Sequence, residues 1–243
     1  RYGAFRVASG DGQETVAGFE TAASSNDVRF RLATDDPRIE VPPSLRDFSE
    51  AEDFRKQAAF LQDTFRLTPT LALKAGLRWD RSTLTGTSGV SPRASLRWQP
   101  GPKWALRGAW GRYTQSPSYE GLQGDGYFLD LRGIKDLRLR PERAEHWLIG
   151  ATRELGGGLR VALDLYDKEL DDILQSGEKL EEVLVLAEDG SVQKASITRP
   201  TFLPENARRG YARGGELVVT ILERPSRPYY GMVSYSFGQA RTR

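Results

Sequence analysis

Side chains that could perform catalysis are scarce in this chain of 243 residues. His146 is the single histidine and cysteine is absent, so a nucleophile activated by histidine has almost no material. The lack of cysteine also removes disulfide scaffolds and thiolate metal sites. We therefore expect no enzymatic activity, and we expect His146 to have a structural or surface role.

Four carboxylates gather near the end of one alternating segment and are the candidates for a metal site or a glycosidase site. A calcium site needs oxygens that converge, usually with a turn glycine, and a glycosidase needs a set distance between two carboxylates. The sequence supplies neither geometry, and a solvated strand tip is the simpler interpretation. We expect no bound metal and no cofactor. The four residues are Asp167, Glu169, Asp171 and Asp172.

Basic side chains occupy several segments of alternating polarity, with the parity opposite to that of the apolar residues beside them. Such cations can pair with carboxylates on neighbouring strands, such as Asp80 and Asp164, or can contact a ligand directly. We favour the structural role. The 35 basic and 33 acidic residues are interspersed, so no basic block indicates a nucleic-acid partner. The basic residues in question are Lys74, Arg78, Arg93, Arg97, Arg107 and Arg160.

Apolar residues at every second position predict the elements that carry these cations. A strand points successive side chains to opposite faces, so this period of two predicts two-faced β-strands. In residues 93–113, for example, Leu96 and Trp98 alternate with Arg97. The apolar face could meet the packed core of a soluble sandwich or membrane lipid. The residues expected on it are Leu71, Leu73, Leu77, Trp79, Leu96, Trp98, Trp104, Leu106, Trp110, Trp147, Val161, Leu163, Leu165, Leu217, Val219, Ile221, Val233, Tyr235 and Phe237.

Short turns and long excursions alternate along the chain. Residues 156–158 are a glycine run without the strand-to-helix context of a phosphate loop, and they predict a hairpin turn. Because consecutive antiparallel strands run in opposite directions, the alternation places all short turns at one end of the sheet. Transmembrane barrels have this asymmetry, with short periplasmic turns and longer extracellular loops. The short turns lie at 68–70, 100–102, 156–158 and 224–228, and the excursions at 81–91, 115–142 and 172–206.

Strand length and the placement of tryptophan also favour a membrane barrel. Several segments run for about ten residues, which suits a tilted transmembrane strand better than a soluble one. Trp98 and Trp104 lie beside a short turn, whereas Trp79, Trp110 and Trp147 lie further along their strands. Two such levels match the aromatic girdles of an outer-membrane barrel. No apolar run approaches the roughly 18 residues of a membrane-spanning helix.

Several stretches between residues 54 and 240, taken in order, resemble the barrel domain of TonB-dependent outer-membrane receptors. The stretch "FLQDTFRLTPTLALKAGLRWD" is similar to a strand pair of that family, with Trp79 where tyrosine is usual. The stretch "SPRASLRWQPGPKWALRGAWGRYTQSPSYEGL" is similar to the next hairpin, and "LRLRPERAEHWLIGAT" resembles the family's Leu-x-Pro-Glu motif. Next, "LRVALDLYDKELDDIL" and "RRGYARGGELVV" fit the following strands. One departure is Leu148, where many members have an acidic residue.

The resemblance implies an all-β, antiparallel transmembrane barrel in the bacterial outer membrane. Of the roughly 22 strands of such a barrel, this chain would supply about ten or eleven. We expect strands and a loop over residues 1–53, with a helical turn after Ser49, and the barrel segment itself over 54–243. No plug-like segment is seen, so we expect the chain to be an internal part of a longer protein.

In that family the basic residues would line the lumen, and the apolar ones would face lipid or form the girdles. The partners implied are outer-membrane lipid, a plug domain of the same protein, TonB, and a small ligand that is carried inward. Aromatic residues of an extracellular excursion are ligand-binding candidates, since loops usually carry recognition, but they could equally pack the loop onto itself. A passive porin and a soluble carbohydrate-binding module are the alternatives. The ligand-binding candidates are Tyr113, Tyr119, Tyr127 and Phe128.

Overall fold

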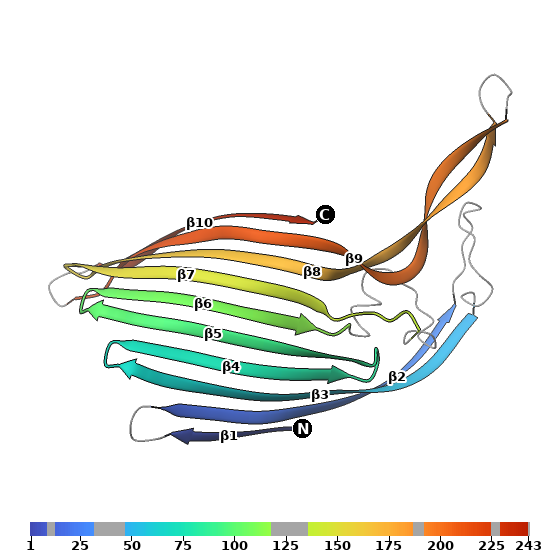
Figure 1. Ribbon diagram of the computed structural model, residues 1–243. Coiled ribbons are helices and arrows are strands. Elements are labelled where there is room, and N and C mark those ends of the chain that lie inside the picture. The colour runs from blue at the N-terminus through green and yellow to red at the C-terminus, as the bar shows by residue number, and fades with distance from the viewer. Residues whose placement is uncertain (9–12, 32–46, 118–135, 187–191, 225–228, 243) are drawn as a thin grey trace.

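The described part of the chain forms one curved antiparallel sheet of ten strands in the computed structural model (Figure 1). The structure describes residues 1–8, 13–31, 47–117, 136–186, 192–224 and 229–242. Within these residues the order of strands in the sheet follows the chain, so each strand pairs with its neighbours in sequence. The described part of the chain holds no helix that is long and apolar enough to cross a membrane. The fold is an all-β, up-and-down arrangement, as the sequence predicts.

The strands differ in length, and several are much longer than those of ordinary soluble sheets. Their bounds are β1 Tyr2–Ala8, β2 Glu14–Arg31, β3 Asp47–Thr68, β4 Leu71–Ser82, β5 Thr87–Gly101, β6 Trp104–Gln115, β7 Glu142–Gly156, β8 Leu159–Leu186, β9 Val192–Ile221 and β10 Gly231–Thr242.

Short turns join strands at one end of the sheet, on the left in Figure 1. The β3–β4, β5–β6 and β7–β8 connections all lie there. Gly156, Gly157 and Gly158 have φ angles of 88°, 58° and 81°, a left-handed backbone that side chains disfavour. This requirement explains the glycine run between β7 and β8. The predicted tight turns at 68–70, 100–102 and 156–158 share one end, as the sequence predicts, and residues 225–228 of the fourth lie outside the described part of the chain.

The register between strands keeps apolar side chains on one face and polar side chains on the other. Leu73 of β4 pairs with Leu96 of β5, and Trp98 of β5 pairs with Leu106 of β6. Arg97 and Arg107 pair in a row of the opposite face. Because side chains alternate with a period of two, one register slip would exchange the faces of a strand. We call the two sides the apolar face and the polar face.

The apolar face has no protein layer over it among the described residues. Buried apolar side chains in this part of the chain are limited to Phe54, Ala58, Leu84 and Leu139. On the apolar face, Leu77, Ile149 and Val233 expose 50%, 62% and 72% of their surface. Soluble monomers rarely expose a contiguous apolar surface of this extent. The ladder hydrogen bonds hold the sheet together, and its apolar face requires an apolar medium or partner.

The predicted helical turn after Ser49 is wrong. Residues 47–68 are the continuous strand β3, in which Ser49 pairs with Arg29 of β2. The run that follows Ser49 is rich in alanine and carboxylates and favours helix locally. Pairing with β2 supplies hydrogen bonds to the backbone along the whole segment, and this tertiary pairing overrides the local preference.

Two of the predicted excursions are mostly strand. β4 ends at Ser82 and β5 begins at Thr87, so the connection over 81–91 is a short turn. β8 and β9 continue as a paired ribbon through most of 172–206, and this hairpin projects beyond the other strands (Figure 1). Register shifts near Ile173 and Glu178 let the pairing continue past the sheet. Of the third excursion, 115–142, residues 118–135 lie outside the described part of the chain.

Candidate functional site

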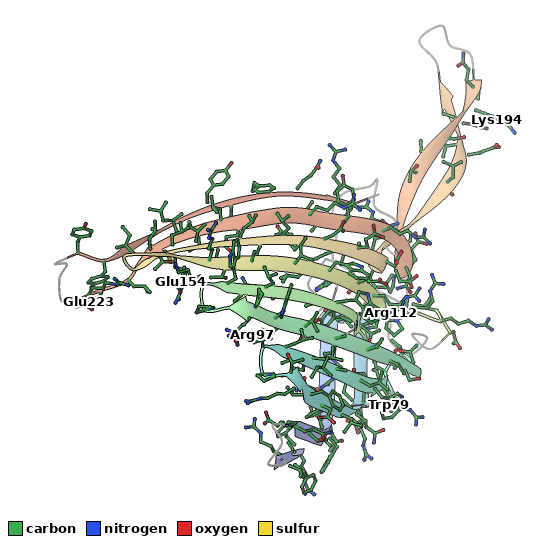
Figure 2. All side chains as sticks on the ribbon, turned by 60° about the vertical axis from the view of Figure 1, so that its left-hand side comes forward. Trp79, Arg97, Arg112, Glu154, Lys194 and Glu223 are labelled. Atoms are coloured by element: carbon green, nitrogen blue, oxygen red, sulfur yellow. The ribbon has the colours of Figure 1, made fainter. Side chains whose placement is uncertain are left out.

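A groove of about 830 Å³ lies on the polar face, in the half of the sheet that carries the short turns. Residues of β3 to β8 line it, and Figure 2 shows Arg97 and Glu154 in this half of the sheet. Glu154 is the only carboxylate among the lining residues. The cations that line the groove are Arg66, Lys74, Arg97, Lys103, Arg107 and Arg160.

The structure places all six sequence-predicted basic residues on the polar face, but they differ in what they contact. Arg78, Arg107 and Arg160 each form an ion pair with a carboxylate of the sheet. Within the described residues, Lys74, Arg93 and Arg97 make no ion pair. The expected structural role therefore fits Arg78, Arg107 and Arg160, which are three of the six. The other half presents unneutralised charge.

The ion pair of Arg107 with Asp164 reaches across three strands. Arg107 on β6 donates from Nε to Asp164 Oδ1 on β8 at 2.7 Å, and its other nitrogen contacts Oδ2. Gly150 of β7 lies between them in register. A Cβ at Gly150 would lie 2.6 Å from Arg107 Nε and closer still to Asp164 Oδ1. The pair exists because that position has no side chain.

Arg78 and Arg160 form the other two sets of ion pairs. Arg78 contacts Asp80 of the same strand at 2.8 Å and Glu20 of β2 at 3.3 Å, bridging over β3. Arg160 of β8 contacts Glu154 of β7 at 2.5 Å beside the glycine turn. Such exposed or half-buried pairs contribute at most about 1 kcal/mol each. Their main effect is to neutralise charge on the polar face.

Tyr113, predicted as a loop residue, lies within β6 near the end opposite the short turns. Its side chain is on the polar face and contacts the ring of His146 on β7, with 4.6 Å between the ring centroids. His146 thus has the structural contact that its sequence context suggests. The other ligand-binding candidates, Tyr119, Tyr127 and Phe128, lie outside the described residues. Tyr113 remains 43% exposed and is accessible from the polar face.

A cluster of polar side chains where the β8–β9 hairpin leaves the sheet was missed by sequence reasoning. Asp172 has φ of 57° and is 9% exposed, and both Arg140 and Arg143 contact it at 2.6 Å. Asn206 accepts a hydrogen bond from the Arg140 amide at 2.7 Å and donates to the Asp172 carbonyl at 2.7 Å. Asp172 is therefore part of a buried junction and does not belong to a solvated strand tip.

The other acidic residues predicted at a solvated tip are also paired. Arg213 of β9 contacts Asp167 at 2.8 Å and Glu169 at 3.0 Å, and Arg209 contacts Asp171 at 3.1 Å. The signal was present in the sequence, because two arginines four residues apart follow on the next predicted strand. Whether these carboxylates are paired depends on the strand that lies beside them, and their own segment does not show which strand that is.

All nineteen apolar residues predicted to share a face do so in register. Trp98 and Trp104 lie next to the short turn between β5 and β6, which spans 102–103. Trp110 and Trp147 form a cross-strand pair further along, with ring centroids 6.0 Å apart, and Trp79 of β4 is 38% exposed at the same end. The indole of Trp110 donates a hydrogen bond to Glu145 at 2.9 Å. Charged residues therefore begin at this level of the apolar face, beyond the stretch of apolar side chains. The band is bounded by tryptophan at both levels.

The described residues contain no group of three or more His, Cys, Asp or Glu side chains placed to hold a metal ion. The groove offers positive charge and hydrogen-bond donors, and Tyr113 with His146 offers aromatic ring surface on the same face. These are the means of binding or docking.

Comparison with known proteins assigns the family. The model described as "TonB dependent receptor-like, beta-barrel" matches residues 2–243. A comparison with curated protein sequences finds no match. Solved structures with the same fold are numerous, and the chain covers about a third of the length of those described next.

Three of these structures illustrate the likeness. The siderophore receptor PirA from Acinetobacter baumannii is 15% identical with a TM-score of 0.62, over 90% of this chain and 33% of that one. The FrpB iron transporter from Neisseria meningitidis is 15% identical with a TM-score of 0.63, over 99% and 36%. A mutant ferric enterobactin receptor, PfeA from Pseudomonas aeruginosa, in complex with enterobactin is 19% identical with a TM-score of 0.64, over 93% and 33%.

Members of this family are transporters of the outer membrane of Gram-negative bacteria and are not enzymes. The family match over 2–243 and the shared fold agree with the two-faced, ten-stranded sheet. The chain belongs to the TonB-dependent receptor family and forms part of its outer-membrane β-barrel.

Proposed function

We propose that this chain is part of the wall of a receptor that binds a ferric siderophore outside the cell and imports it with energy transmitted by TonB. The observation that carries the proposal is the family match over 2–243, on a sheet with one apolar and one charged face. The solved neighbours named for siderophores or iron supply the ligand class. No chemical step on the ligand is part of this function.

In this proposal the apolar face contacts outer-membrane lipid and the polar face lines the lumen. Trp98 and Trp104 then lie at the periplasmic interface, and Trp79, Trp110 and Trp147 at the outer one. Lipid supplies the apolar medium that the exposed Leu77 and Ile149 require. The polar face provides charge to the plug domain that fills the lumen in this family.

Tyr113 is the ligand-binding candidate that the described residues support best. It lies toward the extracellular end of β6, it is partly exposed, and the ring of His146 supports it from the side. An aromatic ring held by a strand gives a ligand contact area at little cost in conformational entropy. Tyr119, Tyr127 and Phe128 of the following excursion remain candidates for the same role.

The test uses the full-length receptor in cells and in purified form. We expect the purified receptor to bind at least one ferric siderophore, detected by quenching of tryptophan fluorescence. Cells expressing it should accumulate radiolabelled iron from that complex, and deletion of TonB should abolish the uptake. Binding by a Tyr113→Ala variant should weaken about tenfold, in line with loss of one aromatic contact. Uptake that persists without TonB would instead indicate a passive porin.

A further inference from the structure

We propose that Arg153 and Trp104 form a binding site for the phosphate group of a phospholipid, on the apolar face at the short-turn end of the sheet. This rests on the proposed function in one respect, namely that lipid covers the apolar face and the short turns lie on the periplasmic side. The ligand is then a phospholipid of the periplasmic leaflet. Phosphatidylglycerol, which has a net negative charge, suits the site best.

Arg153 of β7 is the one charged member of an apolar row. In register it lies between Trp104 of β6 and Val161 of β8, and the row continues through Val219 to Val233. Among the described strands, it is the only basic residue on the apolar face in the half that carries the short turns. Its side chain is exposed. A cation on such a surface needs a counter-charge from outside the row.

The sheet supplies no carboxylate to Arg153. Both strands that flank β7 are present, and β6 contains no acidic residue. On the apolar face of β8 the first carboxylate is Asp167, which lies in register with Trp147 and pairs with Arg213. Glu154, the next residue along the chain, lines the groove of the opposite face. Within the described residues, Arg153 therefore has no ion pair and no side-chain hydrogen bond.

Trp104 orients the guanidinium group. Arg153 Cζ lies 4.8 Å from the centroid of the Trp104 ring, which is a cation–π contact. A guanidinium that stacks on a ring keeps the N–H groups of its edge free, and these match the oxygens of a phosphate group in a bidentate arrangement. Trp104 is 40% exposed, so the pair is accessible from the lipid side. The site is formed before its ligand arrives.

The depth of the pair identifies the anion. Trp98 and Trp104 lie beside the short turn between β5 and β6, and interfacial tryptophan marks the level of the lipid headgroups. An arginine on the lipid face is tolerated at that level, where headgroup phosphates are the abundant anions. The apolar side chains beside Arg153 would contact the acyl chains of the same lipid. Free phosphate gains nothing from that apolar surface, so we assign the site to a phospholipid.

The test uses the purified full-length receptor, stripped of lipid in detergent and titrated with dioleoyl phosphatidylglycerol. Native mass spectrometry gives the dissociation constant of the tightest site, and heat-modifiable mobility in gel electrophoresis verifies that each variant is folded. We expect Arg153→Gln to raise this constant about tenfold, through loss of a charge-assisted contact. Trp104→Leu keeps the charge and removes the ring, and it should raise the constant about threefold. Arg153→Lys should lie between Arg153→Gln and the wild type.

The matched control is Arg97→Gln, which removes an exposed and unpaired arginine from the same half of the sheet but from the polar face. It should bind the lipid as the wild type does. Unchanged binding in Arg153→Gln, or equal losses in Arg153→Gln and Arg97→Gln, would overturn the site.

Two further probes establish the source of the phosphate. Dioleoylglycerol has the same acyl chains without phosphate and should bind weakly, and inorganic phosphate in millimolar excess should not displace the lipid. Tight binding of dioleoylglycerol would mean that phosphate is not recognised, and displacement by inorganic phosphate would indicate a free-anion site. Either result would overturn the proposal. Siderophore binding and iron uptake are scored separately, so a receptor that imports no siderophore could still show, or lack, the lipid site.

Discussion

Gly150 has no side chain, and that space lets Arg107 of β6 reach Asp164 of β8 above the backbone of β7. The ion pair is half-exposed on the arginine side, so its own contribution to stability is modest, at most about 1 kcal/mol. Its larger effect is to neutralise one member of the facing pair Arg97 and Arg107. The absence of a side chain at Gly150 thus determines whether the charge of Arg107 is neutralised within the sheet.

The substitution Gly150→Ala should break the ion pair, because the new methyl group would occupy the space of Asp164 Oδ1 and Arg107 Nε. We expect the free energy of unfolding of the full-length receptor in lipid vesicles to fall by about 1 kcal/mol. Urea unfolding followed by tryptophan fluorescence measures it. In Gly108→Ala the nearest atom would lie 4.0 Å away, so that variant should be as stable as the wild type.

A second substitution shows whether the ion pair is the cause. Asp164→Asn should cost stability in the wild type and nothing further in Gly150→Ala, since the pair is already broken there. Additive losses in the double variant would mean that Gly150 acts through the backbone and not through the pair.

At the scale of elements, the β8–β9 hairpin is distinct because most of it has no neighbouring strand. An isolated two-stranded ribbon is only marginally stable in water. Lys194, near its far end, is labelled in Figure 2 and lies well away from the rest of the sheet. The junction at its base therefore carries the attachment. Asn206 binds both Arg140 and the carbonyl of Asp172 there, which ties β9, β8 and the segment before β7 together.

The substitution Asn206→Ala should loosen this base. Three hydrogen bonds are lost, and the partly buried carbonyl of Asp172 loses the side-chain donor at 2.7 Å. We expect amide hydrogen exchange of Arg140 and of residues 173–175 to accelerate about tenfold, measured by mass spectrometry on the full-length receptor. Lys194→Ala removes only an exposed contact with Glu182 and should leave these rates unchanged. Equal acceleration in both variants would argue against a special role for the junction.

The sequence allowed the faces of the strands and the short turns to be predicted, because both depend on local rules. Alternation between Leu96, Arg97 and Trp98 requires only that a strand forms, and the glycines 156–158 require only a left-handed turn. The lengths of β8 and β9 could not be predicted in this way. A hairpin pairs its own backbone regardless of side-chain polarity, so the polar stretch 172–206 predicts a loop although most of it is strand.

The junction around Asp172 was missed for a different reason. Arg140 and Asn206 are 66 residues apart in sequence, and their contact depends on the shift in register near Ile173. The alternation of polar and apolar residues around Arg140 and around Asn206 gives no sign of that register shift. The sequence also did not show which cations of the polar face are neutralised. Arg107 is neutralised and Arg97 is not, and this depends on Gly150, which lies one strand from Arg107 and two strands from Arg97. The end of β6 carries no apolar residue to extend the alternating pattern, so the pattern alone does not predict that Tyr113 lies in the strand.

For the molecule as a whole, the central feature is a wall that separates an apolar band from a charged lining. Leu165, Ile149, Gly108 and Leu96 lie in one row across four strands, midway between the two levels of tryptophan. In the proposed orientation this row is at the middle of the bilayer, where a charge is most costly.

The substitution Leu165→Arg should therefore destabilise the barrel by about 2–4 kcal/mol, measured by reversible unfolding from phospholipid vesicles. The control is Ala162→Arg on the same strand and on the polar face, where the cost should stay below about 1 kcal/mol because the side chain enters a polar lumen. Similar losses for the two variants would contradict the proposed orientation of the faces.

The up-and-down order of the sheet makes a pair of strands the natural unit of change. In the proposed orientation each unit, such as β5 with β6, begins and ends at the extracellular side and has its short turn on the periplasmic side. Inserting or deleting one unit leaves the direction, facing and register of every other strand as they were. Duplication of a single hairpin can thus widen the wall in one genetic event, with no intermediate that exposes charge to lipid. This modularity accounts physically for the even strand numbers of bacterial barrels.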